Sequence, residues 1–235
     1  MWSIFRTTTA AREELFRGFT DRHSHLLAGV DDGIATLEES LAALTEYEQL
    51  GTRQVWCTPH IMEEQASETA SLRAKFDELK AAYGGSVELR LAAEYMIDGV
   101  LAERLRTRDL LTFDDNRLLV ETSYLAAPTN FRDILAQVNS LGLTPILAHP
   151  ERYNYLYFEE LAELKKHFEL EFQLNIGSLF GDYGNTVRHK ATKLLRRGLY
   201  DYAATDLHSA QTLNHLTNSP ITNTIYQQLE KLMHR

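Results

Sequence analysis

The chain has 235 residues, of which 44% are hydrophobic and 24% are charged, and its formal net charge at pH 7 is -9. This length suits one sizeable domain with a full core, and single α/β barrels often reach it. The negative charge argues against a nucleic-acid partner, because proteins of that class normally present a basic face. No apolar run approaches the roughly 20 residues that a membrane span needs, so we expect no integral membrane segment.

Two further features bear on compartment and domain limits. Cys57 is the single cysteine, which excludes an internal disulfide and is typical of a reducing compartment, so we predict a cytoplasmic protein. Residues 1–18 lack the continuous apolar stretch of a signal peptide. We expect them to be a frayed or loosely docked N-terminal extension; a short amphipathic segment touching a partner or a membrane surface is the alternative. Residues 19–235 are expected to form the single domain.

Short β-rich runs alternate with longer amphipathic stretches along the chain. The first long helix has clear ends: Thr36 is typical of an N-cap, Glu39 completes a capping box, and Gly51 is typical of a C-terminal stop. Pro59 is expected to end the second strand. In chain order, strands are predicted at 18–27, 52–60, 87–96, 117–124, 144–150, 170–179 and 200–208, and helices at 36–51, 67–85, 98–107, 130–142, 158–168, 186–198 and 222–235.

These elements make seven βα units of similar length. Such alternation favours parallel strands covered by helices, and at this length a closed barrel is the natural form. We therefore predict an α/β fold, a distorted (βα)7 barrel in a single domain. In such a barrel the C-terminal ends of the strands open onto one face, where active sites are built from the βα loops.

Side chains that can ligate metals gather at the predicted strand ends. Six of the seven strands deliver His, Asp or Glu there, and the strand at 170–179 delivers the polar residues Asn175 and Ser178. Because side chains alternate along a strand, His23 and His25 share one face, and so do Asp206 and His208. Each pair can converge on one ion. The candidates are His23, His25, Asp31, Asp32, His60, Glu94, Glu121, His149, Asp206 and His208.

Each motif is weak by itself. A single H-x-H, T-P-H or D-L-H is more often a surface or hydrogen-bonded histidine than a ligand, and D-D-G is usually a turn with a solvated charge pair. Glu94 alone would be a strand residue in a salt bridge, and the histidines of helical or terminal segments keep ordinary roles. Together the motifs are more specific, because they place five histidines and four carboxylates at corresponding strand ends. Burying such a cluster without compensating cations would be very costly. The sequence therefore predicts a metal site.

Seven short motifs resemble, in their order, those of the polymerase and histidinol phosphatase (PHP) superfamily of metal-dependent phosphoesterases. They are HSHLLAGVDDG, TPH, AEY, VETS, AHPERY, NIGSLFGDYG and TDLH, and the resemblance extends from Asp21 to about His208. The strongest likeness is to the protein-tyrosine phosphatases of bacterial capsule and exopolysaccharide operons. Such short motifs mean little singly, but seven in order are a specific signal.

The resemblance implies a distorted (βα)7 barrel that holds up to three metal ions. It favours manganese, while mixed nitrogen and oxygen ligands also suit iron or zinc. Asp32 rather than Asp31 matches the family's ligand position, which leaves Asp31 as a turn residue. Carried over residue by residue, the first ion would be held by His23, His25, Glu94 and Asp206, the second by Glu94, Glu121 and His149, and the third by Asp32, His60 and His208.

The implied reaction is hydrolysis of phosphotyrosine by a metal-activated hydroxide, because coordination lowers the pKa of a water toward neutrality and holds it for in-line attack. Arg152, His149 and Asp206 are the predicted catalytic residues. The planar guanidinium of Arg152 suits bidentate phosphate binding, and a salt bridge to Glu151 or to a helix carboxylate is the alternative. A phenolate leaving group, whose parent pKa is about 10, needs less help than an alkoxide, so no general acid is assigned.

Three local features bear on this assignment. A thiolate phosphatase would need an arginine six positions after Cys57, where Glu63 stands, so Cys57 is interpreted as a packed strand residue. Ala28 replaces the family's usual proline, which should only loosen the turn. The family's tyrosine phosphatases often carry a second phosphate-binding arginine after the D-x-H motif, and DLHSAQTLNHL has none. Phosphate binding would then rest on Arg152 alone or on Arg152 with His215.

Three functions are compatible with these predictions. The first is a manganese-dependent phosphatase that acts on the tyrosine-phosphorylated tail of a bacterial kinase controlling polysaccharide export. The second is a phosphatase of a small metabolite such as histidinol phosphate. The third is a non-catalytic regulatory protein that binds an export or kinase complex through the barrel face. The intact set of nine predicted ligands disfavours the third function, and an oligomer is compatible with all three.

Overall fold

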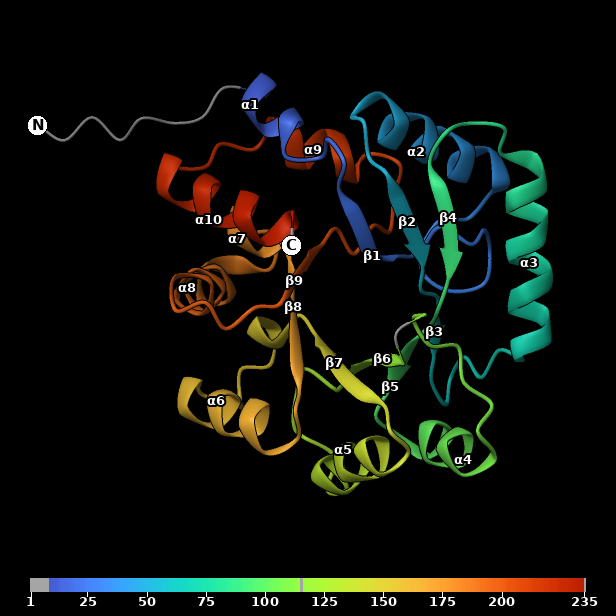
Figure 1. Ribbon diagram of the computed structural model, residues 1–235, viewed down its shortest axis with the longest axis vertical. Helices are drawn as coiled ribbons and strands as arrows, with labels where there is room; N and C mark the ends of the chain where they lie inside the picture. The colour runs from blue at the N-terminus through green and yellow to red at the C-terminus, as the bar shows by residue number, and fades with distance from the viewer. Residues whose placement is uncertain (1–8, 115, 235) are drawn as a thin grey trace, which may run out of the picture.

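The computed structural model describes residues 9–114 and 116–234, and its strands line a central barrel with helices around it (Figure 1). The described residues form a three-stranded sheet in the order β1-β2-β4 and a six-stranded sheet in the order β3-β5-β6-β7-β8-β9. Every strand pairing within these sheets is parallel. The strands are β1 (Thr20–Ser24), β2 (Gln54–Cys57), β3 (His60–Ile61), β4 (Glu88–Leu91), β5 (Glu94–Met96), β6 (Arg117–Glu121), β7 (Thr144–Ala148), β8 (Glu171–Asn175) and β9 (Tyr202–Ala204).

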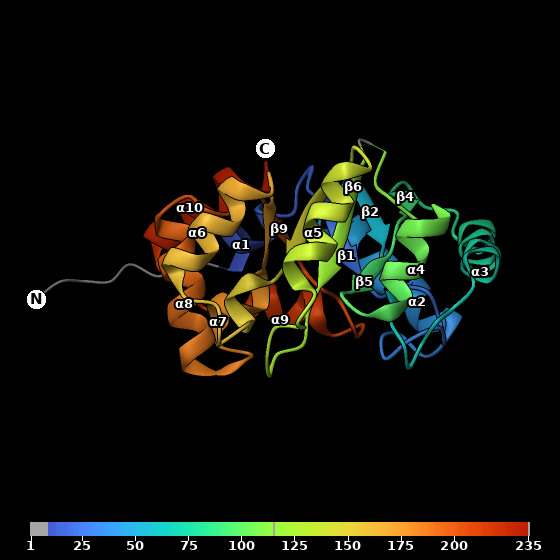
Figure 2. The ribbon, with the colours of Figure 1, turned by 90° about the horizontal axis from the view of Figure 1, so that it is seen from below.

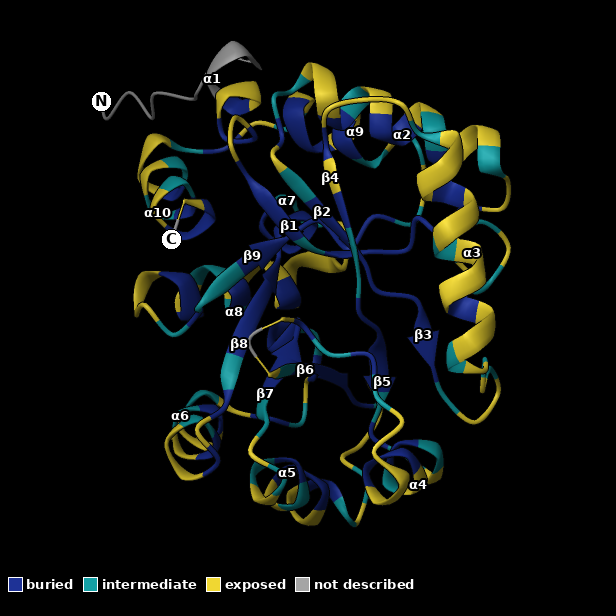
Figure 3. Cartoon of the chain, turned by 45° about the vertical axis from the view of Figure 1, so that its right-hand side comes forward, coloured by how far each residue is buried: buried dark blue, intermediate teal, exposed yellow. Residues whose placement is uncertain are grey.

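Helices surround the strands, and α4, α5 and α6 lie outside the barrel on the side that faces the viewer in Figure 2. Their outward faces are exposed, whereas most strand residues are buried (Figure 3). In the described ranges, no helix has the length and apolar character needed to cross a membrane. The helices are α1 (Thr9–Glu14), α2 (Leu37–Gln49), α3 (Thr69–Ala82), α4 (Gly99–Thr107), α5 (Phe131–Ser140), the 3-10 turn η1 (Pro150–Arg152), α6 (Phe158–His167), α7 (Ile176–Phe180), α8 (Gly184–Arg196), α9 (Thr212–Asn218) and α10 (Asn223–Met233).

The second and third predicted strands are each broken in two. β2 continues into β3, and β4 into β5, after two irregular residues. The Ala92 N–H donates to the Cys57 carbonyl at 3.0 Å and the Glu94 N–H to the Pro59 carbonyl at 3.1 Å, so the paired chains stay together through the breaks. The nine observed strands therefore correspond to the seven predicted ones, with β2 and β3 forming one and β4 and β5 another. The predicted α/β barrel of parallel strands is confirmed, and these breaks are its main distortion.

The ring closes between the first and last strands. The Asp206 N–H donates to the His23 carbonyl at 2.9 Å, and the His25 N–H donates to the Leu207 carbonyl at 2.8 Å. Both bonds join residues at the carboxyl ends of β1 and β9. The closure therefore draws the H-x-H and D-x-H motifs, which are almost the whole domain apart in sequence, against each other.

The capping signals of the first long helix are confirmed. The Thr36 hydroxyl accepts a hydrogen bond from the Glu39 N–H at 3.2 Å, and Glu39 Oε2 accepts one from the Thr36 N–H at 3.3 Å. Gly51 follows α2 with a φ of +76°, a left-handed conformation that glycine adopts without steric cost. This end is correctly predicted because its determinants are local.

Two elements differ from the prediction. The predicted strand at 170–179 ends at Asn175, and the following residues form α7 instead. Asn175 caps that helix, since its Oδ1 accepts a hydrogen bond from the Gly177 N–H at 2.8 Å. Helix α9 was not predicted. Its buried residues Leu213 and Leu216 pack into the core, so α9 is stabilised by tertiary contacts more than by a strong local pattern.

The expectation of a frayed or loosely docked extension is wrong for residues 12–16. Leu15 and Phe16 are buried in the core. Arg12 is also buried, and its Nε donates a hydrogen bond of 2.6 Å to the Thr217 carbonyl at the end of α9. Residues 1–8 lie outside the described residues. Residues 12–16 are therefore packed against the domain, with Arg12 bonded to the end of α9.

Alternation along the strands separates an apolar floor from a polar site. On β6, Leu119 points into a small apolar cluster inside the barrel, and Glu121, two residues later on the same face, lies in the polar site above it. Ala92 and Glu94 have the same relation. The floor beneath the site consists of Trp56, Ala92, Phe113, Leu119, Ile146 and Ala148.

Candidate metal centre

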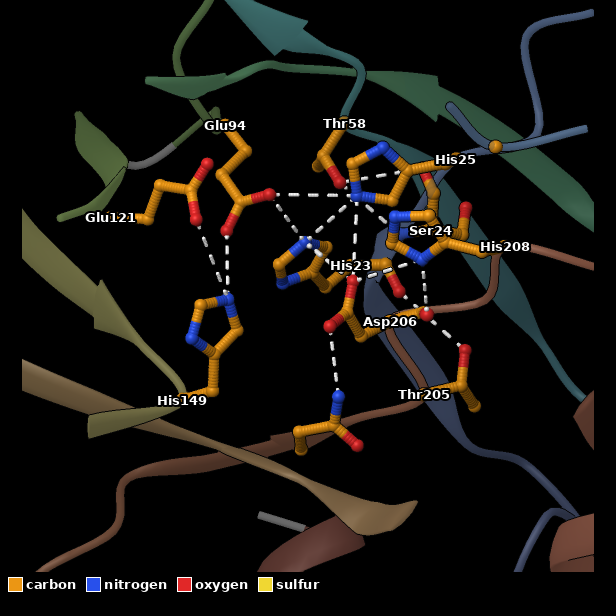
Figure 4. Close-up of polar contacts among 12 residues, drawn as sticks. His23, Ser24, His25, Thr58, Glu94, Glu121, His149, Thr205, Asp206 and His208 are labelled. Carbon is orange, nitrogen blue, oxygen red and sulfur yellow. Dashed lines mark hydrogen bonds and ion pairs between the residues drawn. The ribbon is translucent and has the colours of Figure 1, made fainter. Parts of the chain in front are cut away.

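Glu94 lies at the centre of a buried cluster at the carboxyl ends of the strands (Figure 4). Its Oε2 is 3.0 Å from His23 Nε2 and 3.5 Å from His25 Nε2. Asp206 Oδ1 is 3.2 Å and 3.4 Å from the same two nitrogens. His23, His25, Glu94 and Asp206 thus offer donor atoms that all lie within 4.8 Å of one another. These are the four residues predicted for the first ion.

The second predicted group approaches Glu94 from the other side. His149 Nε2 is 3.1 Å from Glu94 Oε1 and 3.9 Å from Glu121 Oε2. His60 Nδ1 is 3.0 Å from Glu121 Oε1 and 3.2 Å from Glu94 Oε2, so His60, Glu94 and Glu121 also form a compact donor group. Glu94 is shared between this group and the first, as a bridging ligand would be.

The third predicted group lies at the mouth of the site. Asp32 Oδ1 is 3.4 Å from His60 Nε2 and 3.5 Å from His208 Nε2, and with His25 these residues form a further compact donor group. The Asp32 side chain is 73% exposed and that of His208 is 32% exposed. The structure thus brings all nine predicted ligands together in one site, and their roles as ligands stay predictions.

The donor set fits cations. Three buried atoms in it make no hydrogen bond within the described part of the chain, namely His60 Nδ1, Glu121 Oε1 and Asp206 Oδ1. Leaving a buried polar atom unpaired costs about 1–3 kcal/mol, and more where it carries charge. Imidazole nitrogens and carboxylate oxygens are also the ligands that manganese, iron and zinc take in proteins. Bound cations would coordinate these atoms, which lie at ion-pair distance from neighbouring donors and acceptors but make no hydrogen bond.

The electrostatics of the cluster point the same way. Burial would lower the pKa of His23, but the charges of Glu94 and Asp206 outweigh it and raise that pKa to about 9. Burial would raise the pKa of the Glu94 carboxyl, yet the surrounding histidines hold it well below its usual value. The carboxylates of the cluster therefore favour positive charge beside them, which a divalent cation would supply.

Two of the predicted ligands have strained backbones. His149 has a φ of 33° and Asp206 a φ of 52°, and both lie in the left-handed region, which non-glycine residues rarely adopt. Such conformations cost about 1–3 kcal/mol each and persist where the surrounding structure enforces them. At His149 the strain follows β7 directly and brings a side chain into the interior that strand alternation would direct outward.

Asp31 makes contacts beyond those expected of a turn residue. Its Oδ1 accepts a hydrogen bond from the Gly33 N–H at 3.0 Å, as a turn residue would. Its Oδ2, however, lies 2.7 Å from His25 Nδ1 and accepts a bond from the His60 N–H at 3.0 Å. Burial raises the pKa of this carboxyl, but its bond with His25 prevails and lowers the pKa to about 2. Asp31 thus contacts two predicted ligands, His25 and His60, and orients them.

We expect Asp31→Ala to weaken metal binding by about 10- to 100-fold, because partners that fix a ligating histidine have effects of that size. The metal affinity of Asp31→Asn should lie between those of Asp31→Ala and the native protein, since the amide oxygen can still accept a hydrogen bond from His25. Competition of manganese with a chelating dye measures the affinity. Equal affinity of Asp31→Ala and the native protein would show that Asp31 is only a turn residue.

Arg152 lies beside the cluster, in a cavity of about 570 Å³ that the ligands Glu94, His149 and Asp206 also line. Its Nη1 donates to Asp206 Oδ2 at 3.3 Å, and its guanidinium stacks over the rings of Tyr124 and Tyr183. The alternative partners expected for Arg152, Glu151 or a helix carboxylate, are not the ones it contacts. It faces the same cavity as the metal ligands.

His215 and Cys57 also take defined positions. His215 lines the cavity, with its Nε2 2.9 Å from Asp182 Oδ1. Cys57 is fully buried, and burial raises its pKa to about 12. A protonated thiol in the core cannot serve as a nucleophile. The interpretation of Cys57 as a packed strand residue is confirmed.

Two supporting residues were missed in the sequence. Gln173 Oε1 lies 2.7 Å from His23 Nδ1 and fixes that ring. Asp21 is fully buried below His23 and accepts hydrogen bonds from the Tyr47 hydroxyl and from Thr205. Strand alternation is the signal that could have found them, because Asp21 shares a strand face with His23 and His25, and Gln173 shares one with Asn175.

Comparison with known proteins identifies the family. A family model described as capsular polysaccharide synthesis, CpsB/CapC, matches residues 19–231. Tyrosine-protein phosphatase CpsB of Streptococcus agalactiae is 28% identical over 209 residues, which cover 80% of this chain and 82% of that protein. Tyrosine-protein phosphatase YwqE of Bacillus subtilis is 26% identical over 209 residues, covering 86% of this chain and 82% of that protein.

The fold agrees with a solved relative. One crystal structure, from work on YwqE of Bacillus subtilis and CpsB of Streptococcus pneumoniae, superposes with a TM-score of 0.74 at 23% identity and covers 92% of this chain and 91% of that chain. Those two proteins are described as unique metal-dependent tyrosine phosphatases. The matched family model spans nearly the whole barrel and all nine predicted ligands. The predicted family is thus confirmed, and the chain belongs to the CpsB/CapC family of capsular polysaccharide synthesis.

Proposed function

We propose that the protein is a metal-dependent protein-tyrosine phosphatase. The observation that carries this proposal is the continuity of the candidate metal centre with the cavity that holds Arg152. A buried set of nitrogen and oxygen donors next to a guanidinium suits a phosphoester, whose negative oxygens need cations and bidentate donors. The family relatives named as tyrosine-protein phosphatases support the same activity.

The proposed ions are manganese, with iron or zinc as alternatives, and up to three of them are held at the site. When bound, divalent cations lower the pKa of a coordinated water to about 7 and act as Lewis acids toward phosphoryl oxygens. The first ion is assigned to His23, His25, Glu94 and Asp206, the second to Glu94, Glu121 and His149, and the third to Asp32, His60 and His208.

The residues of the chain supply the rest of the chemistry. Arg152 binds the phosphoryl oxygens with a fork of N–H donors. Asp206 holds Arg152 at 3.3 Å, so the guanidinium and the metal centre keep a constant relative position. The apolar floor beneath Glu94 and Glu121 excludes water from below, which strengthens the electrostatic interactions of the site. A phenolate leaves readily enough that no general acid is assigned.

His215 is proposed to assist phosphate binding in place of the missing second arginine. It lines the cavity, and its Nε2 lies 2.9 Å from Asp182 Oδ1. Arg152 remains the main phosphate-binding residue, because it contacts the metal-centre residue Asp206, whereas His215 contacts Asp182.

The proposed substrate is the tyrosine-phosphorylated tail of a bacterial tyrosine kinase that controls capsular or exopolysaccharide biosynthesis. The family's description supports this setting. The proposed location is the cytoplasm, where the tail of such a kinase would be accessible. The alternatives, a phosphatase of a small metabolite or a metal-binding regulator without activity, are outcomes of the test below.

The proposal is tested by turnover of the manganese-loaded protein on a phosphotyrosine peptide and on histidinol phosphate. We expect a clear preference for the peptide, loss of turnover on chelation with EDTA, and recovery when manganese is returned. A strong preference for histidinol phosphate would favour the metabolite phosphatase. Bound metal without hydrolysis of either phosphoester would favour the regulatory protein.

A further inference from the structure

Arg152 is held between two tyrosine rings. Its guanidinium carbon lies 4.2 Å from the centroid of the Tyr124 ring and 4.1 Å from that of Tyr183. Tyr124 belongs to the loop after β6, and Tyr183 to the turn between α7 and α8, so the three residues come from separate loops. All three line the cavity beside the metal centre.

Both rings are themselves anchored to residues of the centre. The Tyr183 hydroxyl accepts a hydrogen bond of 2.9 Å from Asn175 Nδ2, which also donates to Asp206 Oδ2 at 2.8 Å. Tyr124 packs in turn against Tyr153, with ring centroids 5.9 Å apart and planes at 21°. The Tyr153 hydroxyl lies 3.3 Å from His149 Nδ1. Each ring is therefore linked to a predicted metal ligand.

The two rings flank the guanidinium, and one carboxylate, that of Asp206, contacts it. Within the described residues, the guanidinium makes one hydrogen bond, to Asp206, and Asn175 shares that oxygen. Aromatic faces attract a guanidinium without occupying its N–H edge. The remaining donors of Arg152 thus stay available for a ligand.

We infer that Tyr124 and Tyr183 are positioning residues that fix the plane of Arg152 for bidentate binding of a phosphoryl group; this inference rests on the proposed function. Arg152 covers one face of the Tyr124 ring, and Tyr153 packs against the same ring. The tyrosines act through Arg152.

The test measures binding of inorganic phosphate to the manganese-loaded protein by calorimetry. We expect Tyr124→Ala and Tyr183→Ala to weaken binding by about 3- to 10-fold each, the size of a partly buried cation–π contact. Tyr124→Phe keeps the ring face and should bind phosphate as the native protein does. Tyr157→Ala is the matched control, since Tyr157 is 70% exposed and does not line the cavity.

A double-mutant cycle with Arg152→Ala separates the possible roles. In the Arg152→Ala background, Tyr124→Ala and Tyr183→Ala should have no further effect on phosphate binding. A loss that persists in that background, or a Tyr124→Phe variant as weak as Tyr124→Ala, would overturn the inference. Absence of phosphotyrosine turnover by a native protein whose phosphate binding still shows this coupling would overturn the proposed function alone.

Discussion

Glu94→Gln should abolish most of the activity while the fold is retained. Glu94 is fully buried and lies within 3.5 Å of four imidazoles, those of His23, His25, His60 and His149. In the proposed centre it belongs to two ion sites at once. Glutamine has nearly the same shape but lacks the charge, so the change removes the bridging carboxylate and leaves the packing in place.

The expected loss in kcat on a phosphotyrosine peptide is at least about 1000-fold, which corresponds to about 4 kcal/mol of transition-state stabilisation from the cations. Metal content measured by mass spectrometry should fall in parallel. Glu163→Gln is the matched control, because Glu163 is exposed on the outer helix α6. Full metal content with turnover within tenfold of the native protein would contradict the role of Glu94, and circular dichroism checks the fold.

Asp21→Ala should lower the free energy of unfolding by about 3–5 kcal/mol. The carboxylate of Asp21 is fully buried and accepts hydrogen bonds from the Tyr47 hydroxyl at 2.5 Å and from the Thr205 hydroxyl at 2.5 Å. The N–H groups of Thr205 and His23 donate to its other oxygen at 3.1 Å and 3.2 Å. Removing the acceptor leaves these backbone donors unpaired, at about 1–3 kcal/mol each.

This network joins β1 to α2 and to the residue after β9, so it lies at the closure of the barrel. Urea unfolding of the metal-free protein measures the effect without the contribution of metal binding to stability. Tyr47→Phe removes one bond to Asp21 and should cost about 1–2 kcal/mol, whereas Asp77→Ala on the exposed face of α3 serves as the control. A loss below about 1 kcal/mol for Asp21→Ala would contradict the closing role.

Local signals predicted most of the fold. The α2 helix was bounded correctly because Thr36, Glu39 and Gly51 determine its ends within a few residues of chain. The break between β2 and β3 falls at Pro59, where the sequence indicated a strand end. The break between β4 and β5 was not visible in the sequence, because it depends on pairing with neighbouring strands, which periodicity in one strand does not report. Helix α9 was missed for the same reason, since its burial is decided by distant parts of the chain.

The candidate site was also predicted only in part, for the features that local sequence determines. Its nine proposed ligands could be found because they stand near the carboxyl ends of strands or, for Asp32, in the loop that follows one, and parallel strands bring those ends to one face. Asp31 was underestimated, because its contact with His25 depends on the fold of the turn. The grouping of Tyr124 and Tyr183 around Arg152 had no signal in the sequence, since it joins three separate loops.

By itself, then, the sequence determined the repeated βα pattern, the residue types at the strand ends and the resemblance to a family, because strand and helix periods and short motifs are local properties. The tertiary structure alone decided which donors meet around Glu94, how His149 and Asp206 are strained into the site, and what encloses Arg152. These features depend on closure of the barrel between β1 and β9 and on the packing of its loops, which bring together residues far apart in the chain.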